Sequence, residues 1–425
     1  MLTIVLLVMA AGFIIGVPVA FTLGIAALVY FVLDPVLTLT TLPLRFVTGA
    51  ESYTLMAIPL YMLAGNIMNS TGVTEKVFRF TRALVGHFTG GTGQVNILAS
   101  FIFSGMSGSA LADASGLGKV LIKAMVDEGY DRDFSAAVTG ASATIGPVFP
   151  PSIPMVLVGS VAGISIGRLF IGGVVPGILL AVYMAVLVYF ISKKRNYPRS
   201  PRASFGELLS EFRGALPALS TPVVILGGIL GGFFTPTEAG VVAVVYSLII
   251  GLVVYRQATL RDVFNMFITT ARDTAAIMII VAAASGLSWV LSRERIGLVL
   301  TEGITAFSTN PTMVLILIIL GFLVAGCFMN PSANIIIFVP MLMPLVMNVG
   351  IDLVLFGVIA TLTLMVGLVT PPLGLSMFII CGISGISTGQ FTRAMLPFFV
   401  ALLAVIATMI WLPQVVTWLP TLLIG

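Results

Sequence analysis

The sequence predicts an all-α protein that crosses a membrane many times and is built from two repeats of opposite orientation. The chain has 425 residues, of which 59% are hydrophobic and only 8% are charged, whereas soluble domains carry about 25% charged residues. Apolar blocks long enough to span a bilayer, which takes about 20 residues, recur along the whole chain. A Pro-Pro doublet and its surroundings also occur twice, 221 residues apart.

The first apolar block, residues 3–33, is interrupted by Gly-Val-Pro at residues 16–18, and we expect two short spans there. Proline removes a backbone donor and glycine permits a sharp turn, so together they end a helix. The block at 215–255 is interrupted in a similar way at residues 234–238 and is also expected to form two spans. Further apolar blocks lie at 53–71, 93–125, 133–192, 272–291, 311–347, 353–390 and 394–422.

Two polar stretches, residues 34–51 and 256–271, are mildly amphipathic and too polar to span. We expect both to lie as arms along the membrane surface. The blocks at 93–125 and 311–347 are instead broken near their middles by small and polar residues. Such a block is typical of a re-entrant hairpin, whose irregular backbone at membrane depth must be satisfied by protein or by water in a cavity.

Basic residues predict the orientation, because cytoplasmic segments carry an excess of Lys and Arg. One cluster lies in the polar stretch 193–214, which we expect to be a cytoplasmic linker between two halves. The other clusters consist of Lys76, Arg79 and Arg82, of Lys119, Lys123 and Arg132, and of Arg256, Arg261 and Arg272. The loop at 292–310 has balanced charge and is expected outside. Cytoplasmic clusters therefore flank the first hairpin but not the second, which predicts inverted repeats.

The doublets Pro150-Pro151 and Pro371-Pro372 define the repeat, because each follows a glycine and precedes a Gly-Ile-Ser-x-Gly motif. The first half, 1–192, is predicted to contain a hairpin at about 93–128 and a broken helix at about 132–165. The second half, 215–425, is predicted to contain a hairpin at about 311–347 and a broken helix at about 352–389. Inverted repeats with interrupted helices indicate a secondary transporter, with its binding site where the interruptions meet.

Four interruptions carry the expected chemistry, at residues 104–113, 144–152, 326–334 and 367–374. Prolines free backbone carbonyls and Ser or Thr add hydroxyls, so these segments can form neutral oxygen cages that suit a cation such as Na⁺. Half-helices that restart after a break present N–H groups that suit a carboxylate. The alternative is that these small residues only permit close helix packing.

Asp113 is an acid inside a membrane segment, which makes it a candidate functional residue. It either takes part in substrate or ion binding or caps the restarted half-helix. We favour a structural role at a helix N-terminus for Glu238, and no special role for His87, the only histidine. The sequence has no metal-ligand cluster, nucleophile–histidine–acid set or phosphate loop, so we predict neither enzyme activity nor a transition metal.

Three motifs resemble the large membrane subunit, of DctM or SiaM type, of tripartite ATP-independent periplasmic (TRAP) transporters. They are Phe234–Ala239, Phe103–Ser109, and the pair Gly146–Ser152 and Gly367–Pro372. The resemblance covers essentially the whole chain, with Gly240 as a minor departure where alanine is common. It implies an elevator-type carrier of the bacterial inner membrane that imports a carboxylate-bearing organic anion, with sialic acid (N-acetylneuraminate) favoured over C4-dicarboxylates. It also implies coupling to Na⁺ rather than ATP, a small membrane subunit (DctQ or SiaQ type) and a periplasmic substrate-binding protein (DctP or SiaP type).

The same resemblance implies positions for the ligands. The first Na⁺ is expected at Ser104, Ser107, Gly146, Phe149 and Pro151. The second Na⁺ is expected at Gly326, Met329, Gly367 and Thr370, and the substrate at Ser109, Asp113, Asn330 and Asn334.

Two alternative functions belong to other functional classes. An ion channel would require a continuous pore, and a passive scaffold subunit of another permease would tolerate substitutions at the hairpin tips.

Overall fold

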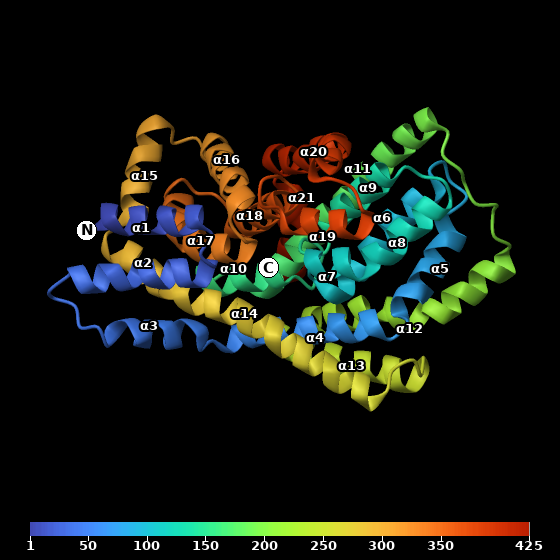
Figure 1. Cartoon of the computed structure of the whole chain (residues 1–425), viewed down its shortest axis with the longest axis horizontal. Coiled ribbons are helices and arrows are strands. Elements are labelled where there is room, and N and C mark those ends of the chain that lie inside the picture. Colours follow the sequence, from blue (N-terminus) through green and yellow to red (C-terminus); the bar gives the residue numbers. More distant parts are fainter. Residues whose placement is uncertain (425) are drawn as a thin grey trace.

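The computed structural model describes residues 1–424, and within that range all regular secondary structure is helical (Figure 1). The helices long and apolar enough to cross a membrane are α11 (Ile166–Arg195), α12 (Phe205–Leu230), α13 with the π-helical turn after it (Pro236–Val254), α14 (Leu260–Arg293), α16 (Pro311–Phe328), α17 (Pro331–Asn348) and α20 (Thr388–Trp411). Shorter apolar helices accompany them. The all-α multi-pass class predicted from the sequence is confirmed.

Glycine and proline divide the spans where the sequence predicts. Helix α1 (Leu2–Ile15) ends at Gly16, which has φ 83°, and α2 (Val19–Leu33) begins directly after Pro18. Helices α12 and α13 are separate as well, so both expected divisions are confirmed. The chain then continues from α2 through α3 (Thr41–Ala50), α4 (Ala57–Ser70) and α5 (Val73–Val85) to the first hairpin.

The second arm differs from the sequence-based expectation. The sequence predicts a surface arm at 256–271 and a separate span at 272–291, but residues 260–293 form the single helix α14. No glycine or proline occurs between Leu260 and Ser285, so nothing ends the helix at the expected boundary. Helix α14 packs against α2, α3, α4 and α17 and runs across one face of the molecule (Figure 1).

The linker that we expect on the cytoplasmic side is irregular over a shorter range than the expected 193–214. Helix α11 continues to Arg195 and α12 begins at Phe205, so only residues 196–204 are non-helical. Ser204 accepts a hydrogen bond from the backbone N–H of Glu207 at 3.2 Å and so caps α12. The polar residues 205–214 therefore extend a membrane helix beyond its apolar part.

The two repeats correspond around the breaks, with α17 of the second repeat in the place of both α7 and α8 of the first. In the first repeat the elements are α6 (Gly91–Ser107), α7 (Ala110–Ser115), α8 (Leu117–Asp127), α9 (Arg132–Ala143) and α10 (Ile153–Ala162). In the second they are α16, α17, α18 (Leu353–Leu368) and α19 (Leu375–Ser384). Helix α17 begins 221 residues after α7 and ends 221 residues after α8, the same offset as between the Pro-Pro doublets. Helix α10 packs on α17, and α19 packs on α7 and α8, so each broken helix contacts the hairpin of the other repeat.

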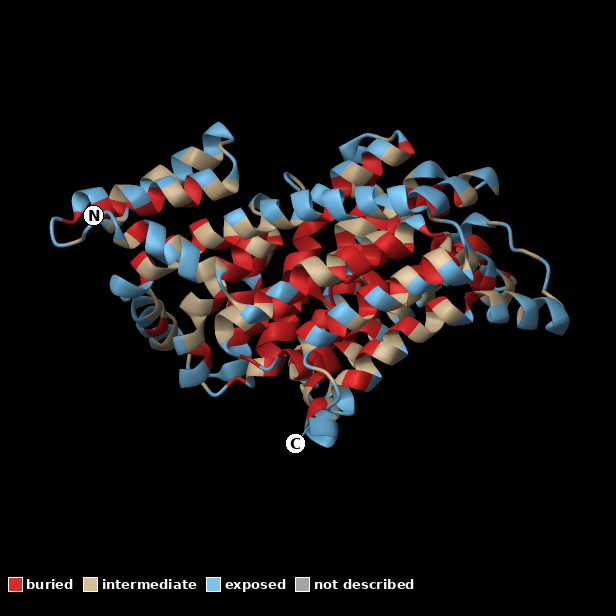
Figure 2. Ribbon diagram, turned by 90° about the horizontal axis from the view of Figure 1, so that it is seen from below, coloured by how far each residue is buried: buried red, intermediate tan, exposed pale blue. Residues whose placement is uncertain are grey.

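Buried residues gather in the middle of the molecule (Figure 2). Every residue of α18 except Leu353 is buried, as expected for a helix that is apolar on all sides. Residues 134–143 of α9 are buried too. By contrast, Val5 is the only buried residue of α1, and α12 buries only a narrow stripe. The first break is therefore largely buried, whereas Pro372 and Leu373 of the second break are exposed, and α1 and α12 lie at the periphery.

Helix α13 begins with a capping box, which confirms the structural role expected for Glu238. The Thr235 hydroxyl accepts from the N–H of Glu238 at 3.3 Å, and the Glu238 carboxylate accepts from the N–H of Thr235 at 2.8 Å. The hydroxyl of Tyr61 on α4 donates to the Pro236 carbonyl at 2.7 Å. This end of α13 is thus fixed both by its cap and by α4.

We expect Thr235→Ala to lower the free energy of unfolding by about 1 kcal/mol, because loss of an N-cap side chain leaves backbone N–H groups without partners. The decrease should appear as a lower midpoint in a thermal unfolding scan of the detergent-solubilised protein. Thr269→Ala is the matched control, since the Thr269 hydroxyl donates only within its own helix, to Asn265 at 3.0 Å. Equal midpoints for the two variants would contradict the role given to the cap.

Candidate functional site

The tip of the first hairpin is joined to the first Pro-Pro break. Helix α6 ends at Ser107, and Gly108 turns the chain with φ 61°. The backbone N–H of Ile153 donates to the Gly108 carbonyl at 3.3 Å. A Cβ on Gly108 would lie 2.5 Å from the Pro151 carbonyl oxygen, so only glycine fits between the tip and the break. The Pro150–Pro151 peptide bond is cis.

Asp113 is buried beside this junction. One carboxylate oxygen, Oδ1, accepts from the Ser107 hydroxyl at 2.5 Å. The other, Oδ2, is buried and has no hydrogen-bond partner. It lies against Gly146, because a Cβ built on Gly146 would be 2.5 Å from it. Ser107, Asp113 and Gly146, which the sequence assigns to two different sites, therefore meet in one place.

Asp113 does not cap the restarted half-helix. That role belongs to Ser109, whose side chain accepts from the N–H of Ala112 at 3.4 Å. The capping alternative for Asp113 is therefore wrong, because its carboxylate points toward Ser107 and Gly146 and not toward the free N–H groups at the start of α7. The carboxylate is left with one oxygen available to a ligand.

The remaining residues expected at the first Na⁺ lie nearby with their side chains engaged elsewhere. The Ser104 hydroxyl donates to the Phe101 carbonyl of its own helix at 2.6 Å. The Phe149 ring packs on Phe101 with 4.6 Å between ring centroids, so its side chain is an apolar packing group. A ligand role for Ser104 or Phe149 would therefore use backbone oxygens or a rotated hydroxyl.

The second hairpin repeats the arrangement of the first. Asn330 caps α17 by accepting from the N–H of Ser332 at 2.9 Å, as Ser109 caps α7. Asn334 is fully buried, and its amide donates to the Met329 carbonyl at 3.1 Å. Its oxygen Oδ1 is buried without a partner, like Oδ2 of Asp113. Each hairpin therefore presents one unpaired side-chain oxygen at the same position of the repeat.

The second hairpin also meets the second Pro-Pro break. A Cβ on Gly367 would come within 2.5 Å of the Gly326 carbonyl oxygen, so the two glycines bring α16 and α18 into backbone contact. The N–H of Leu373 donates to the Cys327 carbonyl at 3.2 Å. The Thr370 hydroxyl donates to the Val366 carbonyl at 2.6 Å. The N–H of Thr370 donates to the Gly367 carbonyl at 3.2 Å, so Gly326, Gly367 and Thr370 are close in space.

The two half-sites differ in charge. Both are lined by carbonyls, hydroxyls and one unpaired oxygen, which are the ligands that hard cations bind. The first holds the carboxyl of Asp113, and the second holds the neutral amide of Asn334. An ionised carboxylate buried without a partner is strongly unfavourable inside a membrane protein. A cation beside Asp113 would remove that penalty, so the residues of the first half-site fit Na⁺.

The four residues assigned to the substrate lie in two half-sites, one in each repeat. Asp113 lies in α7, which packs on α19, whereas Asn334 lies in α17, which packs on α10. Ser109 and Asn330 both act as helix caps. Asp113 and Asn334 are buried, a placement better suited to an ion than to a bulky anion.

Several residues of the site were not among those selected from the sequence. Ser152 caps α10, accepting from the N–H of Met155 at 3.1 Å, and its hydroxyl donates to the Pro147 carbonyl. Gly65 on α4 lies against Ser107, where a Cβ would be 3.1 Å from the Ser107 Cα. The Ser-x-Pro pattern at 152–154 could have indicated the cap. Gly65 carries only the weak signal of its repeat counterpart, Gly286.

Comparisons with known proteins agree with the resemblance read from the sequence. The family model described as "Tripartite ATP-independent periplasmic transporter, DctM component" matches residues 6–415. The sialic acid TRAP transporter large permease protein SiaM of Vibrio cholerae is 42% identical over 410 residues, 96% of each chain. The sialic acid TRAP transporter permease protein SiaT of Haemophilus influenzae is 41% identical over 421 residues, 99% of this chain and 68% of that one.

A relative named for a different substrate also matches, as does a solved structure. The C4-dicarboxylate TRAP transporter large permease protein DctM of Pseudomonas aeruginosa is 36% identical over 399 residues, 94% of this chain and 93% of that one. The crystal structure of the YdaH transporter of Alcanivorax borkumensis, described as having an unusual topology, superposes with a TM-score of 0.67 at 15% identity. It covers 96% of this chain and 99% of that one, and shares the fold.

Proposed function

This chain belongs to the DctM family of TRAP transporters, as a large permease subunit of the inner membrane, and we propose that it imports a carboxylate-bearing organic anion by symport with Na⁺. The observation that carries the proposal is the pair of repeat-related half-sites. In each, a hairpin tip is joined to a Pro-Pro break and an unpaired buried oxygen remains beside it. We assign one Na⁺ to each half-site.

We assign the first Na⁺ to Ser107, Asp113 and the backbone at Gly146, with Ser104, Phe149 and Pro151 as further oxygen donors. The second is assigned to Gly326, Met329, Gly367 and Thr370. A cation in the first half-site would compensate the Asp113 carboxylate, and the restarted half-helices after Ser109 and Asn330 would present N–H groups toward the substrate anion. Binding of cation and anion would then favour each other.

The proposed function requires partner proteins that deliver the substrate. We propose a small membrane subunit and a periplasmic binding protein as partners, which is what the family description of a tripartite periplasmic transporter implies. For the substrate we favour sialic acid, because the two relatives named for it are 41% and 42% identical, against 36% for the C4-dicarboxylate relative DctM of Pseudomonas aeruginosa. We further propose elevator movement of the hairpins and broken helices against α1–α5 and α12–α15.

The proposal is tested with the permease, both partners and N-acetylneuraminate in proteoliposomes. We expect saturable uptake under an inward Na⁺ gradient and none when K⁺ replaces Na⁺. Ser107→Ala and Thr370→Val should each raise the Na⁺ concentration for half-maximal uptake by about 2- to 10-fold, since a hydrogen-bonding hydroxyl contributes about 0.5–1.5 kcal/mol. Uptake that is equally fast without Na⁺ would overturn the coupling, and non-saturable flux would favour a channel.

A further inference from the structure

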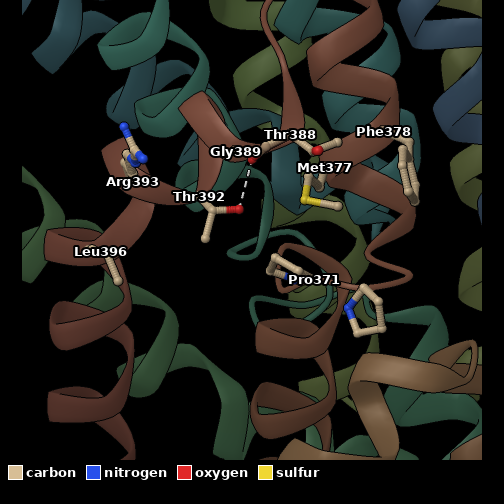
Figure 3. A pocket seen from close by; sticks show the side chains of 9 residues that line it. Pro371, Met377, Phe378, Thr388, Gly389, Thr392, Arg393 and Leu396 are labelled. Atoms are coloured by element: carbon tan, nitrogen blue, oxygen red, sulfur yellow. Dashed lines mark hydrogen bonds between the residues drawn. The ribbon is translucent and has the colours of Figure 1, made fainter.

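A cavity of about 430 Å³ lies between the second Pro-Pro break and the first turns of α20 (Figure 3). Its walls combine Pro371 and Pro372 of the break and Met377 of α19 with the α20 residues Thr388, Thr392 and Arg393. Figure 3 shows Pro371 in the middle of this region and Arg393 at its edge, on the neighbouring helix. None of these residues except the two prolines belongs to the interruptions considered above.

Arg393 is an isolated cation. It is the only charged residue between Asp352 and the end of the sequence. It is exposed, and within residues 1–424 no acidic side chain forms a salt bridge with it. A guanidinium carries five N–H donors in a planar fork that matches a carboxylate or phosphate. An unpaired guanidinium at the rim of a cavity is therefore suited to bind an oxyanion.

The basic clusters assign this cavity to the cytoplasmic side. The turn between α19 and α20 lies beside Arg132, because a Cβ on Gly385 would be 4.0 Å from the Arg132 Nη1. Arg132 follows Asp131, whose carboxylate pairs with Arg195 at 2.8 Å. Both arginines belong to the basic clusters that orient the chain with this side toward the cytoplasm. Arg393 thus lies between the second break and the compartment into which an imported substrate leaves.

We propose that this cavity is an anion subsite on the exit side, in which Arg393 binds the carboxylate of the substrate as it leaves the second break. The inference rests on the proposed function. The Thr388 side chain can add a hydroxyl contact, while the Thr392 hydroxyl donates to the Thr388 carbonyl at 2.8 Å. Met377 and Leu396 form an apolar wall, so the ligand is an organic acid with both polar and apolar faces. The phosphate of an anionic lipid offers the same chemistry. The prolines favour the transported anion, because they place the cavity directly against the second break.

The test uses the complete transporter in proteoliposomes of phosphatidylcholine, with or without added phosphatidylglycerol. Substrate is loaded on the side of the permease that carries Arg393, and Na⁺-driven efflux is measured. We expect Arg393→Gln to raise the KM for N-acetylneuraminate on that side by about 10-fold, the effect of losing about 1.4 kcal/mol of binding. The Na⁺ concentration for half-maximal transport should not change. Arg393→Lys should recover part of the affinity, and Arg202→Gln, in the exposed linker, is the matched control.

Each outcome decides the proposal. An unchanged KM in Arg393→Gln, with a thermal unfolding midpoint equal to that of the wild type, would overturn the subsite. An effect seen only when phosphatidylglycerol is present would overturn it in favour of a lipid phosphate. If the wild type shows no Na⁺-driven transport in either direction, the proposed function itself fails, and the subsite fails with it. A raised KM in both lipid mixtures supports the subsite.

Discussion

Gly367→Ala is expected to abolish Na⁺-driven uptake. The added Cβ would lie 2.5 Å from the Gly326 carbonyl oxygen and 2.7 Å from its Cα, and these are backbone atoms that cannot rotate away. Helices α16 and α18 would have to separate at the point where the second hairpin meets the second break. Overpacking of this kind costs about 1–3 kcal/mol, and the separation would displace the carbonyls assigned to the second Na⁺.

The measurement is the initial uptake rate in proteoliposomes, together with the thermal unfolding midpoint. The matched control is Gly382→Ala on α19, where a Cβ would meet no atom within 4 Å. This control should keep both uptake and stability. Uptake at the wild-type rate in Gly367→Ala would contradict the placement of the second site at this contact.

Asp113→Asn is expected to raise the Na⁺ concentration for half-maximal uptake by about 10-fold or more. An interaction with an ionised group contributes about 1.5–3 kcal/mol, and about 1.4 kcal/mol corresponds to a factor of ten. The amide keeps the shape of the side chain and can still bond to the Ser107 hydroxyl, so the change isolates the charge. The first half-site would then resemble the second, which holds Asn334 at the equivalent position.

Uptake at varied Na⁺ concentration tests this prediction, with Asp127→Asn as the control. Asp127 is an exposed acid in the same hairpin, paired with Lys123 at 2.5 Å, and its loss should leave the Na⁺ dependence unchanged. An unchanged Na⁺ dependence in Asp113→Asn, accompanied by a raised KM for the substrate, would reassign Asp113 from the ion to the substrate.

The sequence predicts the architecture well where composition and chain breaks determine it. The spans follow from apolar blocks, and the divisions at Gly16–Pro18 and before Pro236 follow from residues that cannot continue a helix. The fusion of arm and span in α14 was not predicted, because hydropathy changes near Arg272 while nothing there ends a helix. Hydropathy predicts which residues lie in the membrane, but it does not predict where a helix ends.

The site is predictable to the level of segments but not of individual ligands. The four interruptions indicate where backbone groups lack hydrogen-bond partners within a helix, but not which carbonyl points toward a ligand. Hence the sequence places Ser107 and Asp113 in different sites, although a 2.5 Å hydrogen bond joins them. Arg393 was not among the predicted site residues, because the sequence does not show that the fold brings α20 beside Pro371. Contacts between the repeats depend on packing that no local pattern encodes.

The central claim is that two repeat-related sites bind Na⁺ and couple it to transport. The most direct test is the initial rate of N-acetylneuraminate uptake as a function of Na⁺ concentration, in the wild type and in Asp113→Asn and Thr370→Val. Two coupled sites predict a dependence steeper than first order in the wild type, and a less steep one in each variant. A first-order dependence that neither variant changes, or uptake independent of Na⁺, would contradict the claim.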